Sequence, residues 1–163
     1  MEFTEKSNNK FGFLRAISIS SRKGIQKTNV STAQVVENFG ILGDAHAGKW
    51  HRQISILAME SIDKMKEAGL DNLKPGDFAE NLTTEFLSLP DINIGSKIKI
   101  GDSVLLEVTQ IGKECHNKCA IFKAVGDCVM PREGIFAKVI FGGTIKVNDI
   151  IEIIGIKQNV ELQ

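Results

Sequence analysis

Apolar and polar residues alternate over short stretches along most of this chain, and β-branched residues are frequent within those stretches. Alternation with a period of two is typical of β-strands that bury one face. Glycine, proline, asparagine and aspartate separate the stretches and favour turns. The pattern predicts strands at Phe13–Ser20, Val35–Val36, Arg52–Ala58, Phe78–Thr83, Lys97–Ile100, Val104–Ile111, Ile135–Phe141, Thr144–Val147 and Ile150–Ile156.

One segment follows the helical period instead. Ala58, Ile62 and Met65 stand at i, i+4 and i+7, so they form one apolar stripe on a helix. This predicts a helix over Glu60–Ala68, which Gly69 ends as the first residue past the helix.

Many short strands and few helices favour a mainly β fold, either a sandwich or a closed or partly open β-barrel with a few short helices. Ile98–Asp102 resembles Ile145–Asp149, and each is followed by an apolar strand. Two similar hairpins would suit a closed barrel. Ala120–Val125 is long enough for one or two helical turns.

Composition narrows the class of protein. The chain has 163 residues, which suits one domain, and its 42% hydrophobic and 25% charged residues are typical of a folded globular protein. Twenty basic residues balance twenty acidic ones, which argues against general electrostatic binding to nucleic acid or to an anionic membrane. No apolar run reaches the roughly 20 residues of a membrane helix. Residues 1–10 lack the apolar core of a signal peptide, so we expect a cytoplasmic protein.

The three cysteines all fall within Cys115–Cys128. An odd number in a reducing compartment argues against a disulfide framework. Cysteine reacts as the thiolate, which nearby cations favour. Candidate cations here are Lys113, His116 and Lys118. A thiolate at this place could be a nucleophile, a persulfide carrier or a metal ligand.

Two structural roles for the cysteines are alternatives to a reactive thiolate. Cys128 lies beside Val129 and Met130 and could pack as a small hydrophobic residue, and so could Cys119. The three cysteines together with His116 or His46 could also bind zinc, although the C-x3-C-x8-C spacing differs from the paired C-x2-C motifs that are usual in zinc sites.

A glycine-rich segment, Gly43–Arg52, is the second candidate site. Glycines let the backbone approach a ligand closely, and the side chains of His46, Lys49, His51 and Arg52 can meet an anion. A solvated turn is the alternative. The segment fits neither a P-loop nor a dinucleotide fingerprint.

Two further candidates are single residues in turns. Arg132 could bind a phosphate group with two hydrogen bonds, or it could form a surface pair with Glu133. Asn81 could hydrogen-bond a heterocycle, or it could hold a turn.

Taken together, these segments resemble the MOSC domain, a family named after the C-terminal part of molybdenum-cofactor sulfurases. The resemblance lies in Gly43–Gly48, Arg52–Leu57 with Glu60–Ser61, Phe78–Leu82, Ile100–Val108, the cysteine segment, Arg132–Ala137 and Gly142–Asp149. Their order and spacing match across roughly Gly12–Ile154. We therefore expect a single domain over residues 1–163 with its core at about 12–154.

The resemblance implies a barrel-like fold and a cysteine that either carries sulfane sulfur as a persulfide or ligates molybdenum. The family cysteine follows a strand and a short basic stretch, which places it on Cys115, with Cys119 as second choice. A soft thiolate suits either role. Cations and an amide in the matching segments are candidates for binding the molybdenum cofactor (molybdopterin), namely His46, Arg52, Asn81, Lys113 and Arg132.

The function implied by the resemblance is binding of the molybdenum cofactor, sulfur carriage, or both. The chain lacks the pyridoxal-phosphate-dependent desulfurase domain of the sulfurases, so it has no evident pyridoxal phosphate site. A sulfur-donor desulfurase or a molybdoenzyme is a candidate partner. One alternative is a molybdenum-dependent reductase of N-hydroxylated compounds with a separate electron donor. Another is a non-enzymatic, zinc-stabilised or redox-responsive binding module, and a third is a structural interaction domain in which the cysteines have no functional role.

Overall fold

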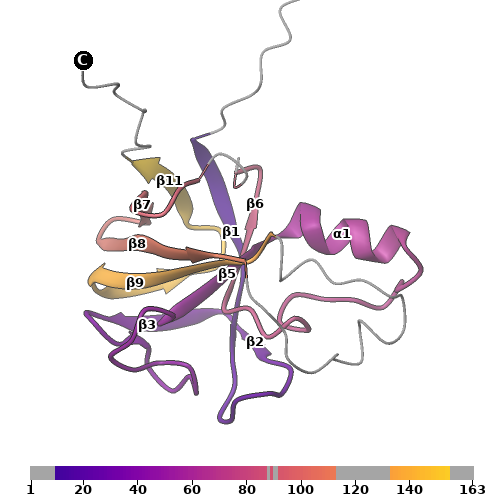
Figure 1. Cartoon of the computed structure of the whole chain (residues 1–163), viewed down its shortest axis with the longest axis horizontal. Coiled ribbons are helices and arrows are strands. Elements are labelled where there is room, and N and C mark those ends of the chain that lie inside the picture. The colour runs from indigo at the N-terminus through magenta and orange to yellow at the C-terminus, as the bar shows by residue number, and fades with distance from the viewer. Residues whose placement is uncertain (1–9, 88, 90–91, 113–132, 155–163) are drawn as a thin grey trace, which may run out of the picture.

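A computed structural model describes residues 10–87, 89, 92–112 and 133–154 of the chain (Figure 1). Eleven strands and one helix lie within these residues. They are β1 (Phe11–Ile19), β2 (Thr28–Val30), β3 (Thr32–Val36), β4 (Gly40–Ile41), β5 (Ile54–Ala58), α1 (Met59–Glu67), β6 (Leu82–Glu85), β7 (Lys97–Ile100), β8 (Val104–Ile111), β9 (Ile135–Phe141), β10 (Gly143–Lys146) and β11 (Ile150–Ile154).

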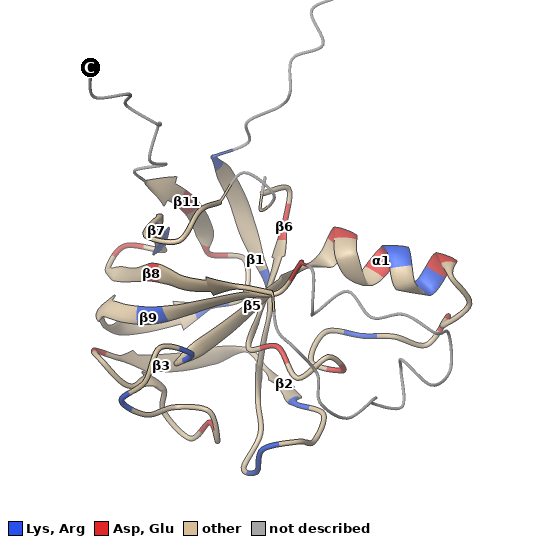
Figure 2. Ribbon diagram, viewed as in Figure 1, with Lys and Arg blue, Asp and Glu red and all other residues tan. Residues whose placement is uncertain are grey.

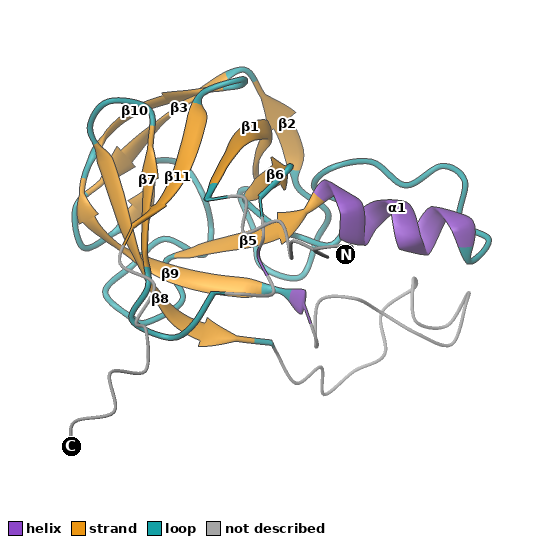
Figure 3. Cartoon of the chain, turned by 90° about the horizontal axis from the view of Figure 1, so that it is seen from above, coloured by secondary structure: helices purple, strands orange, loops and turns teal. Residues whose placement is uncertain are grey.

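Seven of the described strands form a closed barrel in the order β11–β7–β8–β9–β5–β6–β1. The barrel closes because β1 pairs with β11 as well as with β6. Neighbouring strands are antiparallel except β5 and β6, which are parallel. The strand β2 pairs with the distal end of β1, while β10, β3 and β4 form a separate small sheet (Figure 3). The expectation of a mainly β, barrel-type fold is therefore confirmed.

The strand β5 separates two apolar cores. Ile54, Ile56 and Ala58 belong to the large core inside the barrel, while Leu57 belongs to a small core outside it. Side chains alternate between the faces of a strand, and both faces of β5 are covered, so all five of its residues are buried. The small core consists of Leu57, Ile62, Met65, Phe78 and Phe136.

The helix α1 lies beside the barrel and connects β5 to its parallel neighbour β6 (Figures 1 and 3). A connection between parallel strands has to cross the sheet, which a helix does well. Two residues of the predicted stripe, Ile62 and Met65, are buried against the barrel as expected. The third, Ala58, is instead the last residue of β5 and belongs to the barrel core. Gly69 has φ +124°, as expected of the glycine past a helix end. Figure 2 shows acidic and basic residues interspersed along α1.

Most of the predicted strands are confirmed within two residues of their bounds, but the one at Phe78–Thr83 is wrong. The observed strand β6 begins at Leu82, and residues 74–79 before it form two overlapping tight turns. Ala79 has φ +63°, a left-handed conformation that no strand contains. The strand β2 was not predicted, since its three residues, Thr28–Val30, include only one apolar side chain.

The two similar segments do not form two similar hairpins. The strands β7 and β8 pair as a hairpin, as expected. In the second segment, however, β10 pairs with β3, while β11 pairs with β7 and β1. The predicted helical turns at Ala120–Val125 lie outside the described residues. Among the residues that are described, none of the helical structure is long and apolar enough to cross a membrane.

Candidate functional site

A pocket of about 300 Å³ lies on the outer face of the β5–β9 pair, beside the small core under α1. Ser55 of β5 and Phe136 of β9 are directly opposite in the ladder, so their side chains share this face. Three connections complete the walls: the turn after β1, the segment before β5 and the turn before β6. The lining residues are Lys23, Gly24, His46, Trp50, Arg52, Ser55, Phe78, Ala79 and Phe136.

The side chain of Arg52 lies between two aromatic rings. Its guanidinium carbon is 4.6 Å from the ring centroid of Trp50 and 5.6 Å from that of Phe136. The Nε atom is buried and has no hydrogen-bond partner among the described residues. A buried donor without an acceptor is costly, and most buried polar groups have one. An acceptor atom of a bound ligand would remove this cost.

The charge of the pocket favours an anion. Lys23 contributes a second cation, with its Nζ 5.0 Å from the ring centroid of Trp50. None of the described lining residues is acidic. The indole N–H of Trp50 donates to the carbonyl of His46 at 2.7 Å, which fixes the ring that both cations contact. Cations held in a concave site attract phosphate and carboxylate groups.

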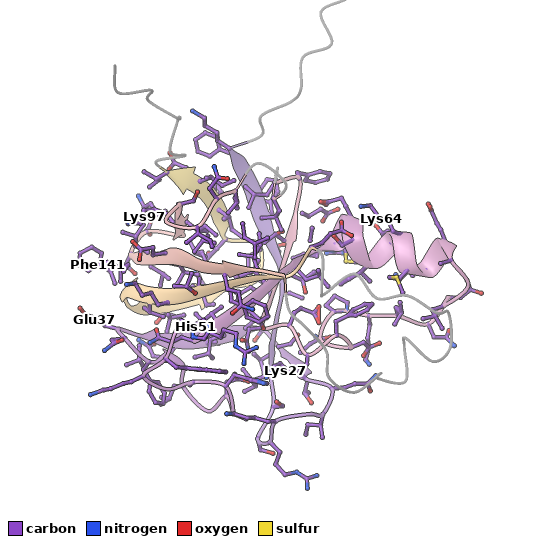
Figure 4. All side chains as sticks on the ribbon, viewed as in Figure 1. Lys27, Glu37, His51, Lys64, Lys97 and Phe141 are labelled. Atoms are coloured by element: carbon purple, nitrogen blue, oxygen red, sulfur yellow. The ribbon has the colours of Figure 1, made fainter. Side chains whose placement is uncertain are left out.

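Behind the pocket, the side chain of Lys27 is fully buried (labelled in Figure 4). Its ammonium nitrogen is 2.7 Å from Asp44 Oδ1, 3.0 Å from Ser20 Oγ and 2.9 Å from His46 Nδ1. Asp44 also accepts the backbone N–H of Ser20 on Oδ1 and that of His46 on Oδ2, both at 3.1 Å. One buried ion pair therefore holds the turn after β1 against the segment that carries His46.

The ion pair also sets the protonation state of Asp44. Burial by itself raises the pKa of this carboxyl group. The hydrogen bond and charge of Lys27, together with the N–H of Ser20, outweigh that effect and hold the pKa below its ordinary value. Asp44 is therefore ionised at neutral pH, and it supplies the negative charge that a fully buried ammonium requires.

The turn before β6 is built around a second buried carboxyl group. Oε1 of Glu80 accepts the backbone N–H of Gly76 at 2.8 Å and that of Phe78 at 3.2 Å. Burial raises the pKa of Glu80 to about 7, although these hydrogen bonds oppose the shift. Gly76 has φ +97°, and a Cβ there would lie 2.5 Å from the carbonyl oxygen of Lys27. Only glycine lets this turn pack against the Lys27 backbone.

The structure brings together two of the residues singled out from the sequence. His46 and Arg52 both line the pocket. Lys49 and His51 are exposed and do not, and His51 Nε2 lies 2.9 Å from Gln110 Oε1 instead (His51 is labelled in Figure 4).

Asn81 is fully buried and contacts protein groups. Its Oδ1 accepts the backbone N–H of Ser55 at 3.0 Å, and its Nδ2 donates to the carbonyl of Ser18 at 3.1 Å. These contacts tie β1 to β5. Asn81 does not line the pocket itself, but it holds Ser55, which is one of the lining residues.

The cysteine segment lies outside the described residues. This applies to Lys113, Cys115, His116, Cys119, Cys128 and Arg132. Glu133, the proposed surface partner of Arg132, accepts hydrogen bonds from Lys64 Nζ at 2.8 Å and Ser61 Oγ at 3.0 Å. Within the parts of the chain that are described, no group of three or more His, Cys, Asp or Glu side chains could hold a metal ion.

Sequence reasoning missed the buried network and most of the pocket lining. Lys27 stands in a polar stretch and carries no motif. Phe136 and Ser55 are unremarkable strand residues until the register places them side by side. Trp50 had a weak signal, because it is the single tryptophan of the chain and follows the glycine segment.

Comparison with known families gives a match to the MOSC domain over residues 43–152. The matched region covers most of the barrel and every segment that lines the pocket except the turn after β1. The chain belongs to the MOSC domain family. No curated protein sequence matches the chain.

Solved structures show the same fold as this MOSC domain. The YuaD protein of Bacillus subtilis has a TM-score of 0.74 at 18% identity, over 88% of this chain and 95% of that one. YiiM of Geobacillus stearothermophilus has a TM-score of 0.66 at 18% identity, over 88% and 75%. YiiM of Escherichia coli has a TM-score of 0.61 at 16% identity, over 87% and 69%. At these identities the likeness concerns the fold.

Proposed function

We propose that this MOSC domain binds the molybdenum cofactor in the pocket between Trp50 and Phe136. Under this proposal a cysteine of the adjoining segment, Cys115 first and Cys119 second, serves as molybdenum ligand or as persulfide carrier. The MOSC family is associated with this cofactor. The observation that carries the proposal is the buried Nε of Arg52, which has no hydrogen-bond partner among the described residues, in a cationic pocket.

The residues present fit the anionic part of such a cofactor. Arg52 and Lys23 would hold a phosphate group through charge-assisted hydrogen bonds, with His46 as a third contact. Lys113 and Arg132 are proposed as further contacts from the cysteine segment. When bound, the cofactor would supply redox chemistry at molybdenum. The protein groups would bind and orient it, while the aromatic rings exclude water from one side.

The ends of the cysteine segment support Cys115 as first choice. Gly112 donates its N–H to the carbonyl of Gly134 at 2.7 Å, and Gly134 is two residues from Phe136 in the pocket wall. Cys115 is three residues beyond Gly112, and three residues of chain span at most about 10 Å. Cys119 is seven residues beyond, so its distance from the pocket is less restricted.

The test is elemental analysis for molybdenum and zinc, on protein purified from a host that overproduces the cofactor. Wild type is compared with Cys115→Ala, Cys119→Ala and, as a matched control, Cys128→Ala. We expect near-stoichiometric molybdenum in wild type and in the Cys128 variant, and its loss in one of the other two. Zinc in place of molybdenum would contradict the proposal and support a zinc-stabilised module.

Protein without molybdenum would still be consistent with transient sulfur carriage, which a second measurement decides. Purified protein is treated with a sulfane-sulfur donor, and the bound persulfide is read by alkylation and mass spectrometry. A carrier cysteine accepts the sulfur, whereas a ligand cysteine is shielded from alkylation when the cofactor is bound. Absence of both behaviours in wild type would overturn the proposed function.

The pocket is tested separately with Arg52→Ala. We expect this variant to lose molybdenum, since Arg52 is a proposed contact of the cofactor. Arg52 makes no ion pair among the described residues, so the unfolding free energy should change by only about 1 kcal/mol, from the lost ring contacts. Arg15→Ala is the matched control, since its side chain is 56% exposed and pairs with Glu85 at 3.5 Å. Equal molybdenum in both variants would place the cofactor elsewhere.

A further inference from the structure

Four large apolar side chains lie close together on the outer wall of the barrel, where β11 and β6 flank β1. They are Phe11, Phe13, Phe86 and Ile150, which we call the β1 patch, and each is between 45% and 60% exposed. Phe13 is opposite Ile150 in the β1–β11 ladder, and Phe11 shares their face because it is two residues before Phe13. The rings of Phe13 and Phe86 meet edge to face with their centroids 6.3 Å apart. The four side chains therefore form one contiguous apolar surface.

Phe86 is held in a costly backbone conformation. Its φ is +67°, in the left-handed region that bulky residues rarely adopt. The backbone N–H of Phe86 donates to Oε1 of Glu60 at 3.1 Å, so the first turn of α1 helps to hold this conformation. Such conformations persist only where the surrounding structure imposes them, and they are frequent at functional sites. Burial of the exposed ring by a partner would offset the backbone cost.

The size of the β1 patch favours a reversible association. About half of each side chain is exposed, which amounts to roughly 400 Å² of apolar surface on one molecule. The largest apolar patch of a monomeric protein has about 300 to 600 Å² and is often functional. Two such surfaces in contact, together with their polar surroundings, would reach the low end of specific protein interfaces, about 1,200 Å² in total. We therefore expect an interface that dissociates on dilution.

The charged residues beside the β1 patch balance each other. Arg15 Nε is 3.5 Å from Glu85 Oε2, and Lys99 is opposite Glu152 in the β7–β11 ladder. A partner that carries one sign of charge would gain no net attraction from these four residues. A second copy of the same surface carries both signs, so a two-fold axis can bring cations of one copy near carboxylates of the other. Charge complementarity therefore favours a second copy of this chain as the partner.

We propose that the β1 patch is the interface of a homodimer with two-fold symmetry. In the dimer, the rings of Phe13 and Phe86 of each copy are buried against the other copy, and the balanced charges form the rim of the interface. None of the four patch residues lines the pocket, so the dimer goes beyond the proposed function and does not depend on it.

The first experiment measures mass against protein concentration by sedimentation equilibrium, with a reductant present to prevent disulfides between copies. We expect wild type to change from monomer to dimer in the micromolar range. Phe86→Ser should weaken the dimer roughly tenfold or more, as is usual for an aromatic residue at the centre of an interface. Phe141→Ser is the matched control, because Phe141 is 58% exposed, against 59% for Phe86, but belongs to β9 (labelled in Figure 4).

A second variant at the same position, Phe86→Gly, separates association from folding. Glycine suits a φ of +67°, so we expect the urea midpoint of this variant to be at least as high as that of wild type when both are monomeric. The variant should still dimerise roughly tenfold more weakly than wild type, because it lacks the ring. If it dimerises as tightly as wild type, the ring is not part of the interface and the proposal fails.

The second experiment tests whether the partner is another copy of this chain. Glu152→Lys makes the rim positive and Lys99→Glu makes it negative, so in each variant alone two like-charged rims face each other. At low ionic strength we expect both variants to dimerise more weakly than wild type. An equal mixture of the two variants should form a mixed dimer that is tighter than the dimer of either variant alone.

Three outcomes would overturn the proposal. The first is a wild type that stays monomeric at every concentration, which would point to a different partner for the β1 patch. The second is equal weakening by Phe86→Ser and Phe141→Ser, and the third is a mixture that associates no better than the separate charge variants. Metal content and sulfur uptake are measured independently of mass, so failure of the dimer leaves the proposed function unaffected, and the reverse also holds.

Discussion

The barrel interior is stabilised differently from the buried polar groups around the pocket, namely Lys27, Asp44 and Glu80, which we call the pocket rim. Inside the barrel, residues such as Leu106 and Ile98 are buried by apolar contacts that have no direction. At the rim, Lys27, Asp44 and Glu80 are equally buried, but each depends on particular hydrogen-bond partners at fixed distances. The interior therefore tolerates a change of shape, while the rim tolerates no loss of a partner. We therefore expect substitutions to be tolerated less well at the rim than in the barrel interior.

The largest effect is expected at the buried ion pair. Lys27→Met leaves the carboxylate of Asp44 buried without its cation, so we expect a loss of roughly 4 to 5 kcal/mol in the free energy of unfolding, measured by urea denaturation. Lys64→Met is the control: its pair with Glu133 is also short, at 2.8 Å, but the lysine is 64% exposed, and the expected loss is below about 1 kcal/mol.

The double variant Lys27→Met with Asp44→Asn sharpens this result. Removing both charges relieves the uncompensated carboxylate, so the double variant should be more stable than the Lys27 single variant. If the single and double variants were equally unstable, the loss would come from packing and not from the buried charge.

A somewhat smaller loss is expected inside the barrel. Leu106→Ala removes a side chain that is 0% exposed, and the cavity should lower the unfolding free energy by about 3 kcal/mol. Leu106→Ile keeps the volume and should cost less than about 1.5 kcal/mol in the same denaturation experiment. A large loss with isoleucine would show that the interior depends on exact shape, and would weaken the contrast with the rim.

The smallest effect, and the only one that raises stability, is expected at Glu80. Burial raises its pKa from 4.5 to about 7, so the native state holds this proton more tightly than the unfolded chain does. Stability contributed by this group is complete below pH 4.5 and is lost as the pH rises through about 7. Glu80→Gln removes the titration and can still accept the N–H groups of Gly76 and Phe78.

We therefore expect Glu80→Gln to be more stable than wild type by about 1 to 2 kcal/mol above neutral pH, because glutamine avoids the cost of ionising a buried carboxyl group. The gain is limited because a neutral amide accepts these hydrogen bonds more weakly than a carboxylate does. The advantage should shrink as the pH falls toward 4.5, in urea denaturation at a series of pH values. Glu85→Gln is the control, because its carboxylate is 31% exposed in the pair with Arg15. A pH-independent difference would exclude titration of Glu80 as the cause.

The sequence by itself determined the local structure of the barrel. Alternation located β1, β5, β7, β8, β9 and β11, and the i, i+4, i+7 stripe located α1, because these periods follow from the geometry of one strand or helix. The ordered motifs also indicated the MOSC family and two pocket residues, His46 and Arg52. Each of these signals lies within a few neighbouring residues of the chain.

Only the tertiary structure decided which distant groups meet. It paired β10 with β3 and not with β11, folded residues 76–78 around the carboxyl group of Glu80, and set Lys27 against Asp44 and His46. It also left Arg52 Nε beside two aromatic rings and without an acceptor in the part of the chain that the structure describes. Local periodicity specifies which face of an element is buried, whereas hydrogen bonds and charge pairs between elements depend on register and packing. The site is made of such contacts, and so it became visible only in the folded chain.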